Sequence, residues 1–104
     1  MVFIETPTFV NQASGVLSDE ELRHIQALLI VRPRAGAPIH GTGGVRKLRW
    51  RGAGRGKRGG LRIIYYLHVP KSRLYLLFMY PKSVRDDLSP RQVEALRKAV
   101  KEIV

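Results

Sequence analysis

Hydrophobic positions follow a helical period in two stretches of the chain and a strand period between them. The first helical stretch carries its apolar residues three or four positions apart, at Leu22, Ile25, Leu28 and Leu29. Ser18 stands just before it, with Glu21 three residues later, which is the pattern of a capping box. Pro33 cannot continue a helix. The pattern therefore predicts an amphipathic helix between Ser18 and Pro33.

A second helix is predicted at the C-terminal end of the sequence. Ser89-Pro90 combines an N-cap residue with proline at the first helical position. The expected buried stripe consists of Val93, Leu96, Val100 and Ile103. Basic residues toward the end of this helix suit its dipole.

Strand patterns occupy the rest of the chain. Val2–Glu5 reads as an edge strand, and Thr8–Ser14 as a short helix. The middle of the chain alternates strands and connections: a long connection at Arg34–Gly44, then Val45–Arg51, a glycine-rich loop at Gly52–Gly60, Leu61–Val69, a turn at Pro70–Arg73, and Leu74–Tyr80. The last two strands are apolar almost throughout, so we expect them to form a buried antiparallel hairpin.

This order of elements predicts one α+β domain spanning residues 1–104. We expect a twisted antiparallel sheet, made of the N-terminal strand and a three-stranded meander, with two N-terminal helices and one C-terminal helix. The helices are expected on one face of the sheet, which leaves the other face for a ligand.

Alternation assigns the cations of the first meander strand to that open face. Leu48 and Trp50 are the natural core residues of Val45–Arg51, so Lys47, Arg49 and Arg51 should point the other way. On the central strand, Arg62 alternates with Leu61 and Ile63 and should share the face of these cations.

The charge of the chain indicates which class of ligand binds to the open face. Nineteen Lys and Arg residues against eight Asp and Glu give a formal net charge of +11. Between Leu22 and Arg85 there are fifteen basic residues and no acidic one. The positive side chains repel one another in the folded state unless a polyanion neutralises them. We therefore predict a nucleic-acid partner.

Several other classes of protein are disfavoured by the composition. Without cysteine the chain has neither disulfides nor thiolate metal sites. No signal-like N-terminus and no apolar run of the ~20 residues needed to span a membrane are seen. We therefore expect a soluble cytoplasmic protein.

The densest cations fall within seventeen residues: Arg46, Lys47, Arg49, Arg51, Arg55, Lys57, Arg58 and Arg62. Alternate cations on a strand stand roughly 7 Å apart, close to the phosphate repeat of a single nucleic-acid strand. The glycines of the loop allow backbone amides to approach phosphate oxygens. This arrangement favours single-stranded nucleic acid as the ligand.

Reactive residues of the common kinds are scarce. His24, His40 and His68 stand apart from one another, and the acid-free middle offers no carboxylates for Mg²⁺. We therefore expect no metal and no cofactor, and metal-free RNA cleavage as the remaining chemistry. In such a reaction a base takes the proton of the ribose 2′-OH, arginines stabilise the charged phosphorane and a cation protonates the leaving oxygen. A lysine crowded by other cations can serve as the base.

Three segments resemble one toxin family: GTGGVRKLR at 41–49, GKRGGLRIIYY at 56–66 and LLFMYPK at 76–82. Together they are similar to the HigB-like branch of the RelE/ParE superfamily of type II toxin–antitoxin systems. The resemblance implies the RelE-like fold and a ribosome-dependent mRNA endoribonuclease that cleaves in the A site and inhibits translation. It also implies a cognate antitoxin, expected to be a HigA-like helix-turn-helix protein, in addition to the ribosome and mRNA.

The resemblance also assigns roles to residues. Lys47 and Arg49 match a basic strand where the family often places a catalytic lysine, Arg62 matches the arginine at the scissile phosphate, and Lys82 matches the active-site rim. The further expected RNA contacts are Arg46, Arg51, Arg55, Lys57, Arg58 and Arg85.

Two positions depart from the family pattern. Ser83 stands where better-known RelE members have an arginine, and Ser89 where they have a tyrosine. Base stacking by that tyrosine is thus missing, so codon preference and rate should differ. Tyr65, Tyr66 and Tyr80 are expected in the core because their strands are apolar on both faces.

Two other functions remain compatible with the sequence. One is a ParE-like toxin that poisons DNA gyrase, and the other is an RNA-binding module without catalytic activity. Dense cations on the strands favour the endoribonuclease over the gyrase poison.

Overall fold

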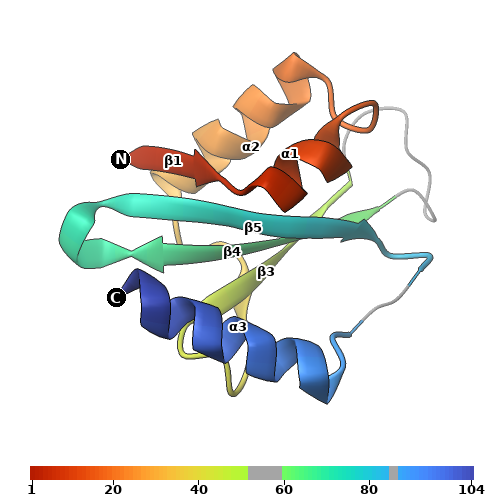
Figure 1. The fold of residues 1–104 in the computed structure, drawn as a ribbon. Coiled ribbons are helices and arrows are strands. Elements are labelled where there is room, and N and C mark those ends of the chain that lie inside the picture. Colours follow the sequence, from red (N-terminus) through yellow and green to blue (C-terminus); the bar gives the residue numbers. More distant parts are fainter. Residues whose placement is uncertain (52–59, 85–86) are drawn as a thin grey trace.

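The chain forms a mixed α+β domain, seen in a computed structural model that describes residues 1–51, 60–84 and 87–104 (Figure 1). The elements are β1 (Val2–Glu5), α1 (Pro7–Ala13), α2 (Asp19–Val31), β2 (Ala37–Pro38), β3 (Val45–Trp50), β4 (Leu61–His68), a short 3₁₀ turn (Val69–Lys71), β5 (Arg73–Pro81) and α3 (Pro90–Ile103). Among the described residues, no helix is both long and apolar enough to cross a membrane.

The five strands lie in the order β1-β5-β4-β3-β2. The meander β3-β4-β5 is antiparallel as predicted, but β1 pairs with β5 in parallel, which corrects the expectation of a wholly antiparallel sheet. The short strand β2 was also missed, because it holds only two residues, one of them Pro38, within the connection after α2.

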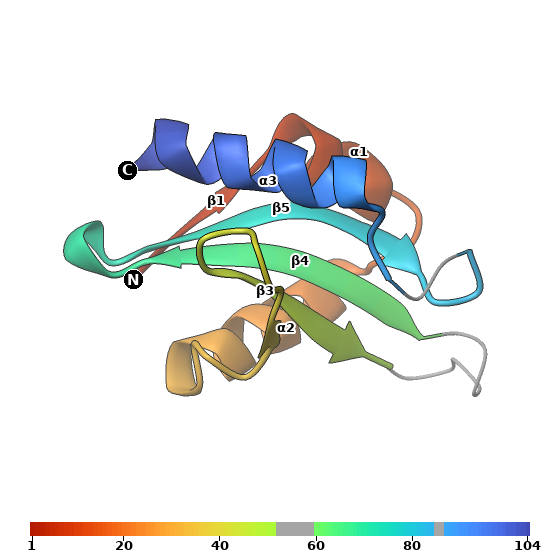
Figure 2. The same cartoon turned by 90° about the horizontal axis from the view of Figure 1, so that it is seen from below.

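The helices cover both faces of the sheet, not one. Figure 2 shows α2 and α3 on opposite sides of the strands. The expectation that one face is left entirely open is therefore wrong. The apolar stripe of α3 buries Leu96 and Val100 against Val45, Ile64 and Tyr66 of that face. Only the part of this face beyond α3 is left for a ligand.

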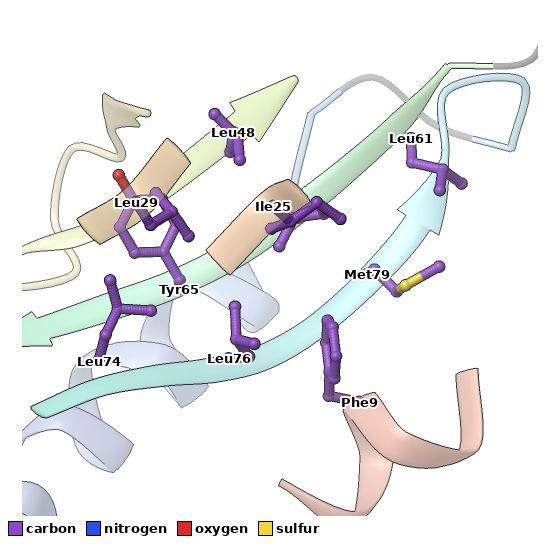
Figure 3. Close-up of a cluster of buried hydrophobic side chains, with 10 residues drawn as sticks. Phe9, Ile25, Leu29, Leu48, Leu61, Tyr65, Leu74, Leu76 and Met79 are labelled. Carbon is purple, nitrogen blue, oxygen red and sulfur yellow. The ribbon is translucent and has the colours of Figure 1, made fainter. Parts of the chain in front are cut away.

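The larger core lies on the α1 and α2 side of the sheet (Figure 3). Phe9 enters it from α1, and Ile25 and Leu29 enter it from α2. The strands contribute alternate residues: Leu48, Leu61, Ile63, Tyr65, Leu74, Leu76 and Met79. Because β4 supplies buried residues to both cores, it is the central strand, as its composition predicted.

Polar caps fix where the helices begin. The Ser18 hydroxyl accepts a hydrogen bond from the Glu21 amide at 3.0 Å, as predicted for the start of α2. Ser89 and Gln92 form a reciprocal capping box at the start of α3. Thr6 caps α1 and also donates its hydroxyl proton to the Leu77 carbonyl, which ties α1 to β5.

A buried polar cluster joins the connection after α2 to the sheet. The Tyr65 hydroxyl donates to the Pro33 carbonyl at 2.8 Å and accepts from the Gly36 amide at 2.9 Å. Burial raises the pKa of this hydroxyl, so it keeps its proton at neutral pH. A side chain at Gly36 would meet the Tyr65 ring at 2.8 Å, so only glycine fits this close approach without a shift.

We predict that Tyr65→Phe lowers the free energy of unfolding by about 1–3 kcal/mol, because it leaves the buried Gly36 amide and the partly buried Pro33 carbonyl without their partner. Denaturant unfolding followed by circular dichroism measures this. Tyr75→Phe is the matched control, since the Tyr75 hydroxyl has no hydrogen-bond partner within the described part of the chain. Equal losses in the two variants would contradict the role given to the Tyr65 hydroxyl.

Candidate active site

The residues most clearly brought together by the sheet are Arg49, Arg62 and Tyr80. Cα pairing places Arg49 opposite Arg62 on β3 and β4, and Arg62 opposite Tyr80 on β4 and β5. Alternation correctly placed Arg62 on the face opposite Leu61 and Ile63. That face was expected to be open, but in the structure it is the α3 face. Arg62 is 5% exposed, so its guanidinium is held by the most buried strand of the molecule.

A pocket of about 310 Å³ opens beside this row. It is lined by Arg49, Trp50, Arg51, Gly60, Arg62 and Lys82. The Lys82 amide donates to the Gly60 carbonyl at 2.9 Å, which holds the segment after β5 against the start of β4 and brings Lys82 to the rim. Among the described residues, three arginines and one lysine therefore line one cavity, and none of the described lining residues is acidic.

Lys47 lies on the same face but outside the pocket lining. It precedes Arg49 by two residues on β3 and stands in the next row, opposite Ile64. Its ammonium group is 3.1 Å from the Asp87 carboxylate, which belongs to the segment leading into α3. Sequence reasoning missed Asp87 because the two residues are forty positions apart.

Arg46 lies on the other face of β3, away from the pocket. Its guanidinium donates to the Gly36 carbonyl at 2.7 Å and to the Arg34 carbonyl at 3.3 Å. These bonds hold the connection around β2 onto β3. The expected contacts Arg55, Lys57, Arg58 and Arg85 lie outside the described residues.

The aromatic residues divide between core and pocket. Tyr65, Tyr66 and Tyr80 are buried, as predicted. Trp50 packs against the larger core as predicted, but it also lines the pocket and donates its indole N–H to Glu21 at 3.3 Å. That double position was not predicted, because alternation alone assigned Trp50 to the core.

None of the three histidines lines the pocket. His24 is exposed on α2 at 4.0 Å from Glu20, His40 is exposed, and His68 is buried beside the Tyr66 ring at the other end of β4. Within residues 1–51, 60–84 and 87–104, no group of three or more His, Cys, Asp or Glu side chains is placed to hold a metal ion.

Chemically, the pocket is suited to a phosphate. Guanidinium groups offer paired N–H donors that match phosphate oxygens, and a lysine adds a mobile point charge. Because Arg62 is fixed by a packed strand, its donors are already oriented before a ligand arrives.

The chain is similar to a known protein family and to a solved structure. The family described as "RelE toxin of RelE / RelB toxin-antitoxin system" matches residues 6–104. Among solved structures, a double arginine-to-alanine mutant of the E. coli toxin RelE in the free state is similar, with a TM-score of 0.63 and 17% sequence identity over 99% of this chain and 97% of that one. That identity speaks for a shared fold alone. The match over almost the whole chain shows that this protein belongs to the RelE toxin family of toxin–antitoxin systems.

Proposed function

We propose that this toxin is a ribosome-dependent endoribonuclease that cuts mRNA in the A site and so inhibits translation. The observation that carries the proposal is the burial of Arg62 on the central strand, in a pocket shared with Arg49, Arg51 and Lys82. Placing a guanidinium at a buried position is costly, and an anion that enters the pocket recovers part of that cost.

The proposed reaction is metal-free attack of the ribose 2′-OH on the adjacent phosphorus. The P–O bond to the 5′ oxygen of the next nucleotide breaks, and that oxygen leaves as a hydroxyl after it gains a proton, so that a 2′,3′-cyclic phosphate remains. Negative charge grows on the phosphorane oxygens in the transition state, where the Arg62 and Arg49 guanidinium groups would stabilise it. We assign the proton transfers to the two lysines. Lys47, whose ammonium group pairs with Asp87 in the neighbouring row, would donate the proton to the leaving oxygen, and Lys82 at the rim, among the arginines of the pocket, would take the proton of the 2′-OH. The 2′-OH requirement makes RNA the substrate, since DNA lacks this group.

Binding along the RNA strand is assigned to the cations beyond the reacting phosphate. Arg51 lines the pocket and would contact a flanking phosphate. The proposal keeps the further expected RNA contacts, which lie outside the described residues: Arg55, Lys57, Arg58 and Arg85. We do not assign Arg46 to RNA, because its guanidinium bonds to backbone carbonyls on the other face.

A cognate antitoxin is the proposed protein partner, of the HigA-like helix-turn-helix kind. The net charge of +11 favours an acidic or amphipathic antitoxin segment, and salt should weaken the complex.

The experiment that tests the proposed function compares three substrates. Purified toxin is incubated with programmed ribosomes, with the same mRNA free in solution, and with DNA gyrase and plasmid. We expect cuts in the A-site codon by primer extension, and little cleavage of free mRNA, because the ribosome must align the 2′-OH with the phosphate. Gyrase-dependent DNA breaks, or RNA binding without cleavage on ribosomes, would contradict the proposal.

For Arg62 we predict that Arg62→Ala lowers the cleavage rate on ribosomes on the order of a hundredfold, through lost stabilisation of the transition state. Arg62→Lys should restore only part of the rate, because an ammonium group cannot form the paired hydrogen bonds of a guanidinium. Single-turnover cleavage of A-site mRNA measures both.

Arg73→Ala is the matched control for Arg62. It removes an arginine from the same hairpin at its opposite end, where Arg73 pairs with His68. Its cleavage rate should stay within about twofold of wild type, because no phosphate-binding role is assigned there. Circular dichroism shows whether the Arg62→Ala variant is folded. If that variant is unfolded, or if it cleaves as fast as the Arg73→Ala variant, the role assigned to Arg62 is wrong.

A further inference from the structure

The ion pair between Lys47 and Asp87 joins the sheet to the segment that enters α3. The two side chains differ sharply in burial, since Lys47 is 14% exposed and Asp87 is 87% exposed. The ammonium group is thus nearly enclosed, and the carboxylate reaches it from the solvent side.

The backbone next to Asp87 is fixed on its C-terminal side. Leu88 packs against the core beneath α3. Ser89 then begins the helix with a capping box, in which its amide donates to the Gln92 side chain at 2.9 Å and its hydroxyl accepts from the Gln92 amide at 3.2 Å. Asp87 therefore lies one residue before Leu88, which is fixed by the core, and two residues before Ser89, which caps α3.

The Asp87 carboxylate is a negative charge on a face that otherwise presents cations. Lys47, Arg49, Arg62 and Lys82 lie on the face or at the pocket rim, and a negative charge here repels an RNA phosphate. An ion pair with one partner mostly in water contributes little to the free energy of unfolding. A long lysine side chain, by contrast, loses considerable rotamer freedom when a partner fixes it.

We propose that Asp87 is a positioning residue, which holds the Lys47 ammonium group in place beside the cationic pocket. This inference rests on the proposed function, since Lys47 is assigned there to the reaction. Asp87 acts through Lys47 and touches no reacting atom. Fixing a flexible side chain before substrate binds raises the rate of the chemical step more than it changes binding.

The test is a double-mutant cycle on ribosome-bound mRNA, with Asp87→Asn, Lys47→Ala and the double variant. Asp87→Asn should lower the maximal cleavage rate about tenfold while the half-saturating toxin concentration changes by less than about threefold. Asp87→Glu, which keeps the carboxylate, should recover the rate to within about threefold of wild type. In the Lys47→Ala background, Asp87→Asn should cause no further loss.

Glu94→Gln is the matched control, because Glu94 is an acid of α3 that pairs with Arg97 within the helix. It removes the same charge, and its cleavage rate should stay within about twofold of wild type. The melting temperatures of Asp87→Asn and Glu94→Gln should both lie within about 2 °C of wild type.

Three results would overturn the proposal: Asp87→Asn as active as wild type or more so, an equal loss in the Lys47→Ala background, or a failure of Asp87→Glu to recover. If wild-type toxin does not cut on ribosomes at all, the proposed function fails, and the positioning contact is judged by NMR instead. A proton–nitrogen signal of the Lys47 ammonium group that is seen in wild type and lost in Asp87→Asn supports the contact. A signal unchanged by Asp87→Asn refutes it.

Discussion

A charged guanidinium within the central strand is the constraint on which the rest of this structure depends. Strand β4 buries both of its faces, yet it carries Arg62 at a position only 5% exposed. The sheet accommodates this charge because the α3 face ends in a pocket at that point, between Arg49 of β3 and the segment after β5. The core that stabilises the fold thus also fixes the group that would meet the phosphate.

Helix α3 divides the second face of the sheet into two parts. The apolar stripe of α3 covers the part of this face near Val45 and Tyr66. The part that carries the cations of the pocket stays accessible. Together with the Lys47–Asp87 pair, this arrangement links the position of α3 to the cations beside it. One helix therefore contributes both to the stability of the sheet and to the boundary of the candidate site.

Local sequence signals predicted most of the elements. Helices α2 and α3 were expected because Ser18 and Ser89 mark their starts and periodic apolar residues follow. The parallel pairing of β1 with β5 could not be predicted, since it joins segments about seventy residues apart that carry no shared local pattern. The irregular register at Ile64/Tyr65 was equally hidden, because β5 is apolar at nearly every position and either register buries apolar side chains.

The face on which each site residue lies could be predicted from the alternation of residues along the strands. The partners of these residues could not, because tertiary contacts determine them. Alternation placed Lys47, Arg49 and Arg62 on one face, which is where the structure has them. Charge density alone could not separate Arg46, which bonds to backbone carbonyls, from its neighbours on β3. Nor could it reveal Asp87, because only the docking of α3 brings that carboxylate to Lys47.

The chemistry assigned to this face depends on one atom of the substrate, the 2′ oxygen next to the scissile phosphate. The most direct measurement uses ribosomes carrying an mRNA with a single 2′-deoxynucleotide at the position mapped as the cleavage site in the all-ribose message. We predict that the toxin no longer cuts at that phosphate, although the same protein cuts the unmodified message. Cleavage of the deoxy message at the unmodified rate would contradict the account.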